Sequence, residues 1–201
     1  MKKLLYTLLA VSIIFSACEQ EDEQPNNSNN NSLSIGDYHQ GGVIFYLNGN
    51  GGGLICDITD IASPLNQVGW GCVTDSVAGA ASTSIGGGFS NTTDIINGCN
   101  EVGYAAEICY NLTKAGYSDW YLPSKDELNE MYINKTTINT TSISNGGYAL
   151  NISDDDDEYW SSTQGHQEEN GGYGFIQRFG DGHQKTRWKS NIACARAIRN
   201  F

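Results

Sequence analysis

Residues 119–128 are Asp119-Trp120-Tyr121-Leu122-Pro123-Ser124-Lys125-Asp126-Glu127-Leu128. Their order predicts a short buried strand over 119–122, a stop at Pro123 and a helix over 125–132. Ser124 stands three residues before Glu127. This is the spacing of a capping box, in which each side chain accepts a hydrogen bond from the backbone N–H of the other residue. We expect the segment to brace the fold from inside, with Trp120 in the core.

The rest of the chain predicts a mixed order of strands and helices. A hairpin is expected over 41–58, followed by a long irregular region over 59–92. One helix is expected over 94–113, because apolar residues recur there at three- and four-residue steps. A polar stretch fills 133–158. Three strands are then expected over 159–163, where Trp160 should pack in the core, over 173–179 and over 193–199, with a tight turn at 180–182. This order predicts an α+β fold with helices packed on an antiparallel sheet.

The N-terminus has the features of a secretory signal peptide over residues 1–17. Two lysines precede an apolar run that is too short to span a membrane. The run ends in Phe15-Ser16-Ala17-Cys18, which resembles a bacterial lipobox. We expect Cys18 to carry a lipid that anchors the protein at the cell outer membrane, facing the periplasm or exposed at the surface. A plain signal peptide cut near Ala17 is the alternative. Residues 18–34, acidic and then rich in asparagine, predict a solvated tether.

The charge of the chain restricts its partners. The sequence has 11 basic and 23 acidic side chains, a formal net charge of −12. Loss of the signal peptide removes two lysines and makes that charge two units more negative. Such a chain repels nucleic acid, anionic lipid headgroups and sulfated glycans. The composition therefore excludes nucleic acid and favours cations or neutral molecules as partners.

The cysteines indicate disulfides. The sequence has 6 cysteines, and an exported protein with so many usually crosslinks them. Cys99 and Cys109 should lie about 15 Å apart along one continuous helix, whereas a disulfide needs Cα atoms within about 7 Å. Cys99 and Cys109 should therefore not pair with each other. Our hypothesis is that Cys72 pairs with Cys99, and that Cys109 pairs with either Cys194 or Cys56. The spacings are too wide for a zinc knuckle.

Several blocks of sequence resemble a known family. They are Gly41-Gly42-Val43-Ile44-Phe45-Tyr46, Trp70-Gly71-Cys72, residues 116–128, Tyr159-Trp160-Ser161-Ser162-Thr163 and Ala195-Arg196-Ala197-Ile198-Arg199. Together they look like the domain of unknown function at the C-terminus of the Legionella collagen-like adhesin. Leu122-Pro123-Ser124 followed by Asp126-Glu127-Leu128 is also similar to formylglycine-generating enzymes. The resemblance implies a C-type-lectin-like domain over 35–201, with a twisted antiparallel sheet, two helices and long loops. It does not give the function, because this architecture hosts enzymes and binding proteins alike.

The C-terminal part holds the candidate binding residues. Trp188 stands between Arg187 and Lys189, and Tyr173 follows a Gly-Gly pair. Exposed aromatic side chains stack on sugar rings or fill pockets in a partner. The predicted ligand-binding residues are therefore Trp188, Tyr173 and Arg187. A basic cluster here either offsets the acidic run at 154–158 or binds an anionic partner; it consists of Arg178, Lys185, Arg187, Lys189, Arg196 and Arg199.

One metal site is a candidate. Asp154, Asp156, Asp157 and Glu158 offer carboxylates of the kind that calcium binds. Consecutive side chains point in different directions, so this run needs further ligands, and a solvated acidic loop is the simpler interpretation. The Glu-Pro-Asn and Gln-Pro-Asp motifs typical of calcium-dependent lectins are absent from the sequence. We expect no cofactor, with calcium as the one candidate.

The sequence carries no pattern typical of catalysis. The histidines, His39, His166 and His183, stand in no recognisable nucleophile motif. The predicted function is non-enzymatic adhesion to, or binding of, an extracellular glycan or protein through residues 59–92 and 145–190. One alternative is an oxidase related to formylglycine-generating enzymes. Those enzymes use a close pair of cysteines near the C-terminal end, where this chain has only Cys194. A second alternative is a structural envelope component without a small ligand.

Overall fold

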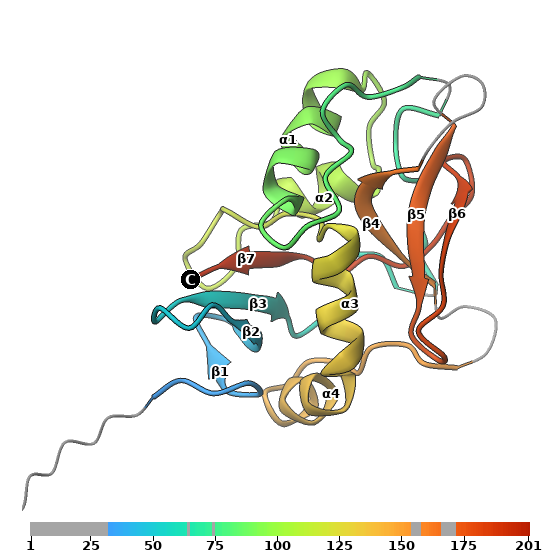
Figure 1. Cartoon of the computed structure of the whole chain (residues 1–201). Coiled ribbons are helices and arrows are strands. Elements are labelled where there is room, and N and C mark those ends of the chain that lie inside the picture. Colours follow the sequence, from blue (N-terminus) through green and yellow to red (C-terminus); the bar gives the residue numbers. More distant parts are fainter. Residues whose placement is uncertain (1–31, 64, 74, 154–157, 166–171) are drawn as a thin grey trace, which may run out of the picture. The chain divides into compact units, whose positions relative to one another are not determined.

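The computed structural model describes residues 32–63, 65–73, 75–153, 158–165 and 172–201. Apart from Ser32, these residues belong to one compact unit, Leu33–Phe201 (Figure 1). The predicted signal peptide, Cys18 and the tether up to residue 31 lie outside the described residues. Within the described ranges, no helix is both long enough and apolar enough to cross a membrane.

The described elements form an α+β fold, as predicted. In chain order they are β1 (Tyr38–His39), β2 (Gly42–Leu47), β3 (Gly53–Asp57), α1 (Gly88–Gly98), α2 (Ala105–Tyr110), α3 (Lys125–Ile133), α4 (Lys135–Ser144), β4 (Glu158–Gln164), β5 (Tyr173–Arg178), β6 (Gln184–Trp188) and β7 (Ile198–Asn200). The first sheet has the order β1-β2-β3-β7, and the second has the order β4-β5-β6. Every pair of neighbouring strands in both sheets is antiparallel.

The predicted hairpin is the centre of the first sheet. Strands β2 and β3 pair with Val43 opposite Cys56, and β7 covers the other edge of β3 with Ile198 opposite Cys56. Successive residues of β2 enter two different core clusters, with Ile44 in one and Val43 and Phe45 in the other. Both faces of the first sheet are therefore buried, which explains why β3 is apolar without clean alternation.

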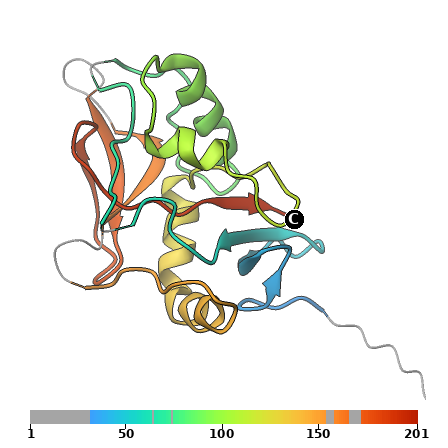
Figure 2. The same ribbon diagram turned by 180° about the vertical axis from the view of Figure 1, so that it is seen from behind.

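Helices cover the two faces of the first sheet. Seen from opposite sides in Figures 1 and 2, α2 and α3 lie on opposite sides of β7. Ala105 and Cys109 of α2 pack in the cluster that contains Trp70, Trp120 and Trp160. Leu128 and Met131 of α3 pack in the cluster that contains Tyr121, Tyr159 and Phe179. The expected burial of Trp120 and Trp160 is confirmed, since neither is exposed at all.

The capping box is also present and reaches further than predicted. Ser124 Oγ accepts from Glu127 N at 3.3 Å, and Ser124 N donates to a Glu127 carboxylate oxygen at 2.7 Å. The other oxygen of Glu127 accepts from Gly86 N at 2.8 Å. The carbonyl of Pro123 accepts from Ser162 N at 2.7 Å. The segment therefore ties α3 both to the loop before α1 and to the second sheet.

The strand predicted over 119–122 is wrong, because only one residue of it pairs as a strand would. Tyr121 N donates to Ile198 O at 2.8 Å, and Ile198 N donates back to Tyr121 O at 2.9 Å. The next residue, Leu122, instead exchanges hydrogen bonds with the hydroxyl of Thr92 in α1. A side chain from a helix thus satisfies the backbone groups that a second ladder position would use.

The single helix predicted over 94–113 is wrong as well. The structure has α1 and α2 with a break between them, because Cys99 is extended (φ −99°, ψ 137°) and Gly103 has φ 77°. A positive φ is easily adopted by glycine and ends a helix. The break turns Cys99 towards its disulfide partner, so the crosslink and the end of α1 coincide.

Three further expectations need correction. Helix α4 lies in the stretch that was expected to be merely polar. The sequence does not indicate this helix, because only two of its residues, Ile138 and Ser142, are buried. Strand β6 lies in the basic cluster, where no strand was expected, because two of its five residues are exposed, the other three are only partly buried, and its sequence therefore lacks an apolar face. The last strand is regular only over Ile198–Asn200; Ala193, Cys194 and Ala195 form isolated bridges before it. The strands predicted over 159–163 and 173–179 are confirmed as β4 and β5.

Candidate functional site

Two predicted binding residues meet on the second sheet. Tyr173 of β5 lies directly opposite Trp188 of β6, and their ring centroids are 4.2 Å apart with 31° between the planes. All four tryptophans lie within the described residues; Trp188 is 53% exposed and the other three are fully buried. We call the Tyr173–Trp188 pair the aromatic ledge. Aromatic rings with a polar edge of this kind suit stacking against a sugar ring.

Arg187, the third predicted residue, is not part of the aromatic ledge. Neighbouring residues of a strand point to opposite faces of a sheet, so Arg187 and Trp188 are separated by the sheet itself. The Arg187 guanidinium pairs with Glu158 of β4, and Lys185 Nζ lies 2.8 Å from the same carboxylate. Two members of the basic cluster therefore offset the end of the acidic run, which is one of the two roles expected for them.

The candidate calcium site is only partly described. Asp154, Asp156 and Asp157 lie outside the described residues, and Glu158 is nearly buried between its two cationic partners. Among the residues that the structure does describe, no group of three His, Cys, Asp or Glu side chains could hold a metal ion.

The face that carries the aromatic ledge continues into a small hollow. Phe175, two residues along β5, borders a cavity of about 150 Å³ whose other walls are Ser76, Ala81, Thr83, Thr163, Gln164 and Gly165. Gly165 joins the hollow to the ledge: its N–H donates to Tyr173 O at 2.8 Å. A Cβ at Gly165 would lie 2.8 Å from Thr186 Cγ2, so no larger side chain fits there without movement. The polar walls are hydroxyl and amide groups without charge.

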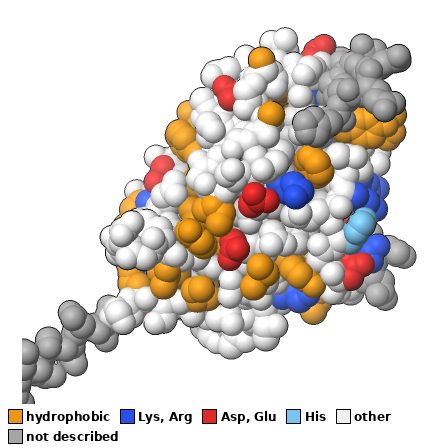
Figure 3. Space-filling model, viewed as in Figure 1, with side chains coloured by type: hydrophobic (Ala, Val, Ile, Leu, Met, Phe, Trp, Pro, Cys, Tyr) orange, Lys and Arg blue, Asp and Glu red, His pale blue; other side chains and the backbone are white. Residues whose placement is uncertain are grey.

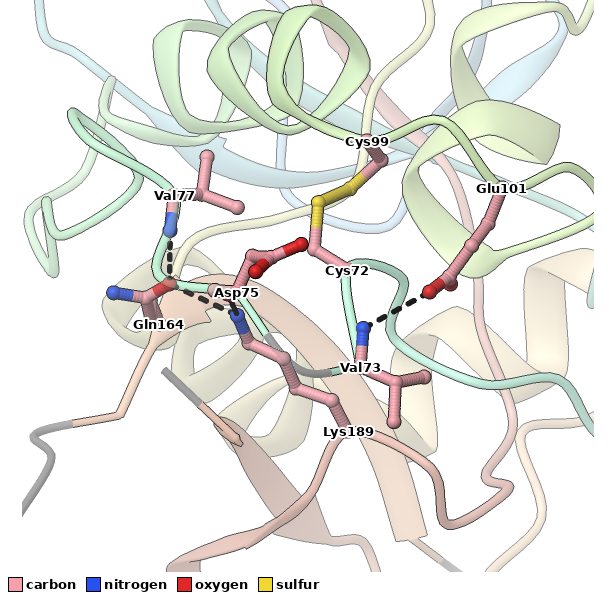
Figure 4. The surroundings of a disulfide bond; sticks show 8 residues. All are labelled: Cys72, Val73, Asp75, Val77, Cys99, Glu101, Gln164 and Lys189. Carbon is pink, nitrogen blue, oxygen red and sulfur yellow. Dashed lines mark hydrogen bonds between the residues drawn. A yellow bond between two sulfur atoms is a disulfide. The ribbon is translucent and has the colours of Figure 1, made fainter. Parts of the chain in front are cut away.

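A segment crosslinked by a disulfide lies beside Gln164 and Lys189 (Figure 4). We call residues 72–73 and 75–77 the clamped segment. The predicted Cys72–Cys99 disulfide is present, with Cα atoms 5.0 Å apart. Val73 N donates to Glu101 Oε1 at 3.1 Å, and Val77 N donates to Gln164 Oε1 at 2.7 Å. Two backbone amides that follow Cys72 in the chain are thus held by side chains of other segments.

Lys189, the residue after β6, is hydrogen-bonded to the clamped segment. Its Nζ donates to Asp75 O at 2.8 Å and to Gln164 Oε1 at 2.9 Å, and it lies 4.3 Å from the centroid of the Trp70 ring. The residue is fully buried. Burial disfavours the charged form and lowers the pKa of Lys189 to about 8. This lysine of the predicted basic cluster is therefore a structural donor and not a surface charge.

The remaining members of the basic cluster also have acidic partners inside the fold. Arg196 Nε lies 2.7 Å from Asp60, Arg199 Nε lies 2.7 Å from Asp119, and Arg178 Nη2 lies 2.5 Å from Asp181. The Arg199 guanidinium holds the pKa of Asp119 below its usual value through its hydrogen bonds. Every member of the basic cluster, all of which lie in the described residues, is thus engaged by an acidic side chain or by internal acceptors.

The expected second disulfide is wrong. Cys109 and Cys56 are buried free thiols, so Cys109 pairs with neither of its candidate partners. Desolvation raises the pKa of Cys56 to about 12 and raises that of Cys109 as well. Both thiols therefore stay protonated at neutral pH, which makes them poor nucleophiles. Cys194 is also buried, and its sulfur accepts from Gln67 Nε2 at 3.8 Å.

A second cavity lies elsewhere on the molecule. It has a volume of about 620 Å³ and lies between residues 59–65 and 148–151. The exposed side chains of Leu65 and Tyr148 border it. Its one carboxylate, that of Asp60, already accepts from Arg196 Nε and, at 2.8 Å, from the hydroxyl of Tyr159. Neither aromatic residue singled out from the sequence lines this cavity.

Sequence reasoning found the aromatic pair but missed what surrounds it. The alternation of Tyr173 and Phe175 within one predicted strand could have placed Phe175 on the same face. Nothing in the sequence links Gln164 to Lys189, because that contact depends on how the clamped segment folds over the sheet.

Comparison with known proteins supports one relationship. A family model described as the Lcl C-terminal domain matches residues 67–199. The match includes the clamped segment, the aromatic ledge and both cysteines of the disulfide, and it begins after the β2–β3 hairpin. No curated protein matches the chain significantly.

Proposed function

Because the chain belongs to the Lcl C-terminal domain family, we propose that it is the non-enzymatic adhesion domain of a cell-envelope lipoprotein and binds neutral glycans. The observation that carries the proposal is the aromatic ledge, in which the exposed Trp188 stacks on the partly exposed Tyr173 beside a hollow with uncharged polar walls. Aromatic faces bind the apolar faces of sugar rings, and neighbouring hydroxyl and amide groups suit sugar hydroxyls.

Charge supports a neutral ligand over a sulfated one. The chain has a formal net charge of −12, and the arginines and lysines near the ledge are occupied by internal partners. A polyanion would meet repulsion without a compensating basic patch. Figure 3 shows the hydrophobic side chains of the visible face in small groups separated by charged and neutral ones. A large protein interface would favour one contiguous apolar patch on that face.

The proposed setting at the cell envelope rests on the N-terminal sequence. Lys2, Lys3 and the apolar run before Cys18 are typical of an exported lipoprotein. We also propose a C-type-lectin-like architecture for 35–201, since two antiparallel sheets, helices on both faces and a long irregular region agree with that resemblance. Two protonated buried thiols favour binding over cysteine-based oxidation.

The test is a glycan array of neutral and sulfated oligosaccharides probed with the purified protein, with and without calcium. Trp188→Ala and Tyr173→Ala should each weaken binding of the neutral oligosaccharides at least tenfold, because an aromatic side chain central to an interface contributes about 2 kcal/mol or more. Tyr148→Ala is the control, since Tyr148 is also an exposed aromatic residue but lies at the other cavity.

Three results would contradict the proposal. The array stays silent with and without calcium; sulfated oligosaccharides bind best; or Tyr148→Ala abolishes binding that Trp188→Ala leaves intact. The last outcome would move the site to the larger cavity. Capture of a protein partner without any glycan signal would replace the glycan as the ligand.

A further inference from the structure

The clamped segment and the aromatic ledge share a boundary at Gly172. A Cβ placed on Gly172 would lie 2.8 Å from the Trp188 ring and 3.8 Å from the carbonyl oxygen of Val73. The Gly172 carbonyl accepts from Lys189 N at 2.7 Å, directly after Trp188 in the chain. The indole of Trp188 therefore packs where the clamped segment approaches the sheet, and a shift of that segment changes the surroundings of the ring.

The disulfide is the one covalent attachment in the clamped segment. Its described residues are otherwise held by one hydrogen bond to Glu101, two to Gln164 (through Val77 N and Ser76 Oγ), one to Lys189 and the packing of Val77 in the core. None of the strand pairings in the described sheets includes the clamped segment. Loss of the crosslink should therefore loosen this border while the strand ladders persist.

We infer that the Cys72–Cys99 disulfide is a redox switch that holds the aromatic ledge in its binding form. This inference rests on the proposed binding function of the ledge. Oxidation keeps the clamped segment against the sheet; reduction releases it and lowers the affinity for the glycan.

The chemistry requires an external dithiol. Cys99 is partly exposed and Cys72 is buried, so a reductant thiolate reaches the sulfur of Cys99 first. Attack on that sulfur forms a mixed disulfide and expels the thiolate of Cys72, which takes a proton from water. The second thiol of the reductant then attacks the reductant sulfur that is bonded to Cys99. This step releases Cys99 as a thiol and leaves the reductant as a cyclic disulfide.

The experiment measures the clamped segment and the ledge separately. Backbone hydrogen exchange is followed by mass spectrometry in the oxidised protein and after treatment with dithiothreitol, with alkylation to count reduced cysteines. We expect faster exchange at the amides of Val73 and Val77 and unchanged exchange in β2 and β3. Acrylamide quenching of tryptophan fluorescence should change as well, because Trp188 is the exposed tryptophan. On the same glycan array, the reduced protein should give a signal at least tenfold lower than that of the oxidised protein.

A Cys72→Ser/Cys99→Ser variant provides the control. It should behave as the reduced protein does, and dithiothreitol should have no further effect on it. If this variant fails to fold, the titration of the natural protein with dithiothreitol still decides. Unchanged exchange at Val73 and Val77 after both thiols have been alkylated overturns the switch. An array that is silent for the oxidised protein overturns the proposed function instead, and the exchange result then stands by itself.

Discussion

Glu127 shows how much one side chain contributes when it lies fully inside the fold. Its two carboxylate oxygens accept from Ser124 N and Gly86 N, and the hydroxyl of Tyr121 lies 3.5 Å away. Burial raises the pKa of Glu127, and the N–H donors offset part of that rise. The bond to Ser124 could be predicted because its partner is three residues away. The bond to Gly86 could not, since it depends on where the glycine-rich loop ends.

Replacing Glu127 by glutamine should lower the free energy of unfolding by about 1–3 kcal/mol, the usual cost of leaving a buried polar group unsatisfied. The amide nitrogen would face a backbone N–H where the second carboxylate oxygen now accepts. Urea denaturation at neutral pH measures the loss. Asp126→Asn is the control, because the half-exposed Asp126 interacts with the helix dipole and with Lys125 Nζ at 3.9 Å, and each of these is worth at most about 1 kcal/mol. Equal losses would argue against the buried network.

Lys189 should make stability depend on alkaline pH. The folded protein releases this proton near pH 8, whereas the unfolded chain holds it up to about 10.5. Between these values the unfolded state binds more protons, so this group makes the folded state more stable as the pH rises. Above pH 8, the unfolding free energy of the natural protein should therefore increase relative to that of Lys189→Met. Taking the difference cancels the titration of cysteines and tyrosines.

At the scale of elements, helix boundaries depend on contacts that the sequence does not display. The apolar period over 94–113 is real, since Ile95, Ala106 and Cys109 are all buried. It is shared by two helices, however, because the disulfide at Cys99 and the positive φ of Gly103 interrupt the backbone between them. Hydrophobic period reports which residues face the core and carries little information about a break between them.

Helix α4 depends on very few core contacts, which makes it a sharp test of burial. Ile138 is fully buried and Ile143 is 60% exposed in the same helix. Ile138→Ala should lower the free energy of unfolding by about 2–5 kcal/mol, as large-to-small core substitutions do. Ile143→Ala should change it by about 0.5 kcal/mol or less. Thermal and urea denaturation of the two variants check this, and similar losses would mean that α4 does not dock as described.

At the scale of the whole molecule, the fold class was accessible from sequence because each hairpin and capping signal is local. The candidate site was accessible only in part. Tyr173 and Trp188 were recognisable as aromatic residues in polar sequence. Their stacking, however, depends on strand β6, which could not be predicted because its residues are mostly polar and basic. The clamped segment joins residues more than a hundred positions apart, as in the bond from Lys189 to Asp75. Such pairings follow from topology and leave no trace in spacing or composition.

The proposed membrane anchor can be tested on the full-length chain. Cys18→Ser in the full-length protein should move it from the membrane fraction to the soluble fraction, because lipidation supplies the proposed attachment. Fractionation with metabolic labelling by a radioactive fatty acid measures both effects. Ser16→Ala, which keeps a small residue before the cleavage site, should leave label and fractionation unchanged. Unlabelled natural protein would point to a plain signal peptide.

The pairing of β7 with β3 determines where this domain can be cut. The family match spans 67–199, but β1, β2 and β3 lie before it and supply three of the four strands of the first sheet. A protein trimmed to the matched residues would leave β7 as an unpaired edge and uncover the apolar side chains that the hairpin now buries. Exposed edges of that kind recruit strands from other molecules. A protein trimmed at the family boundary should therefore aggregate, whereas one that starts at residue 33 keeps all four strands of the first sheet.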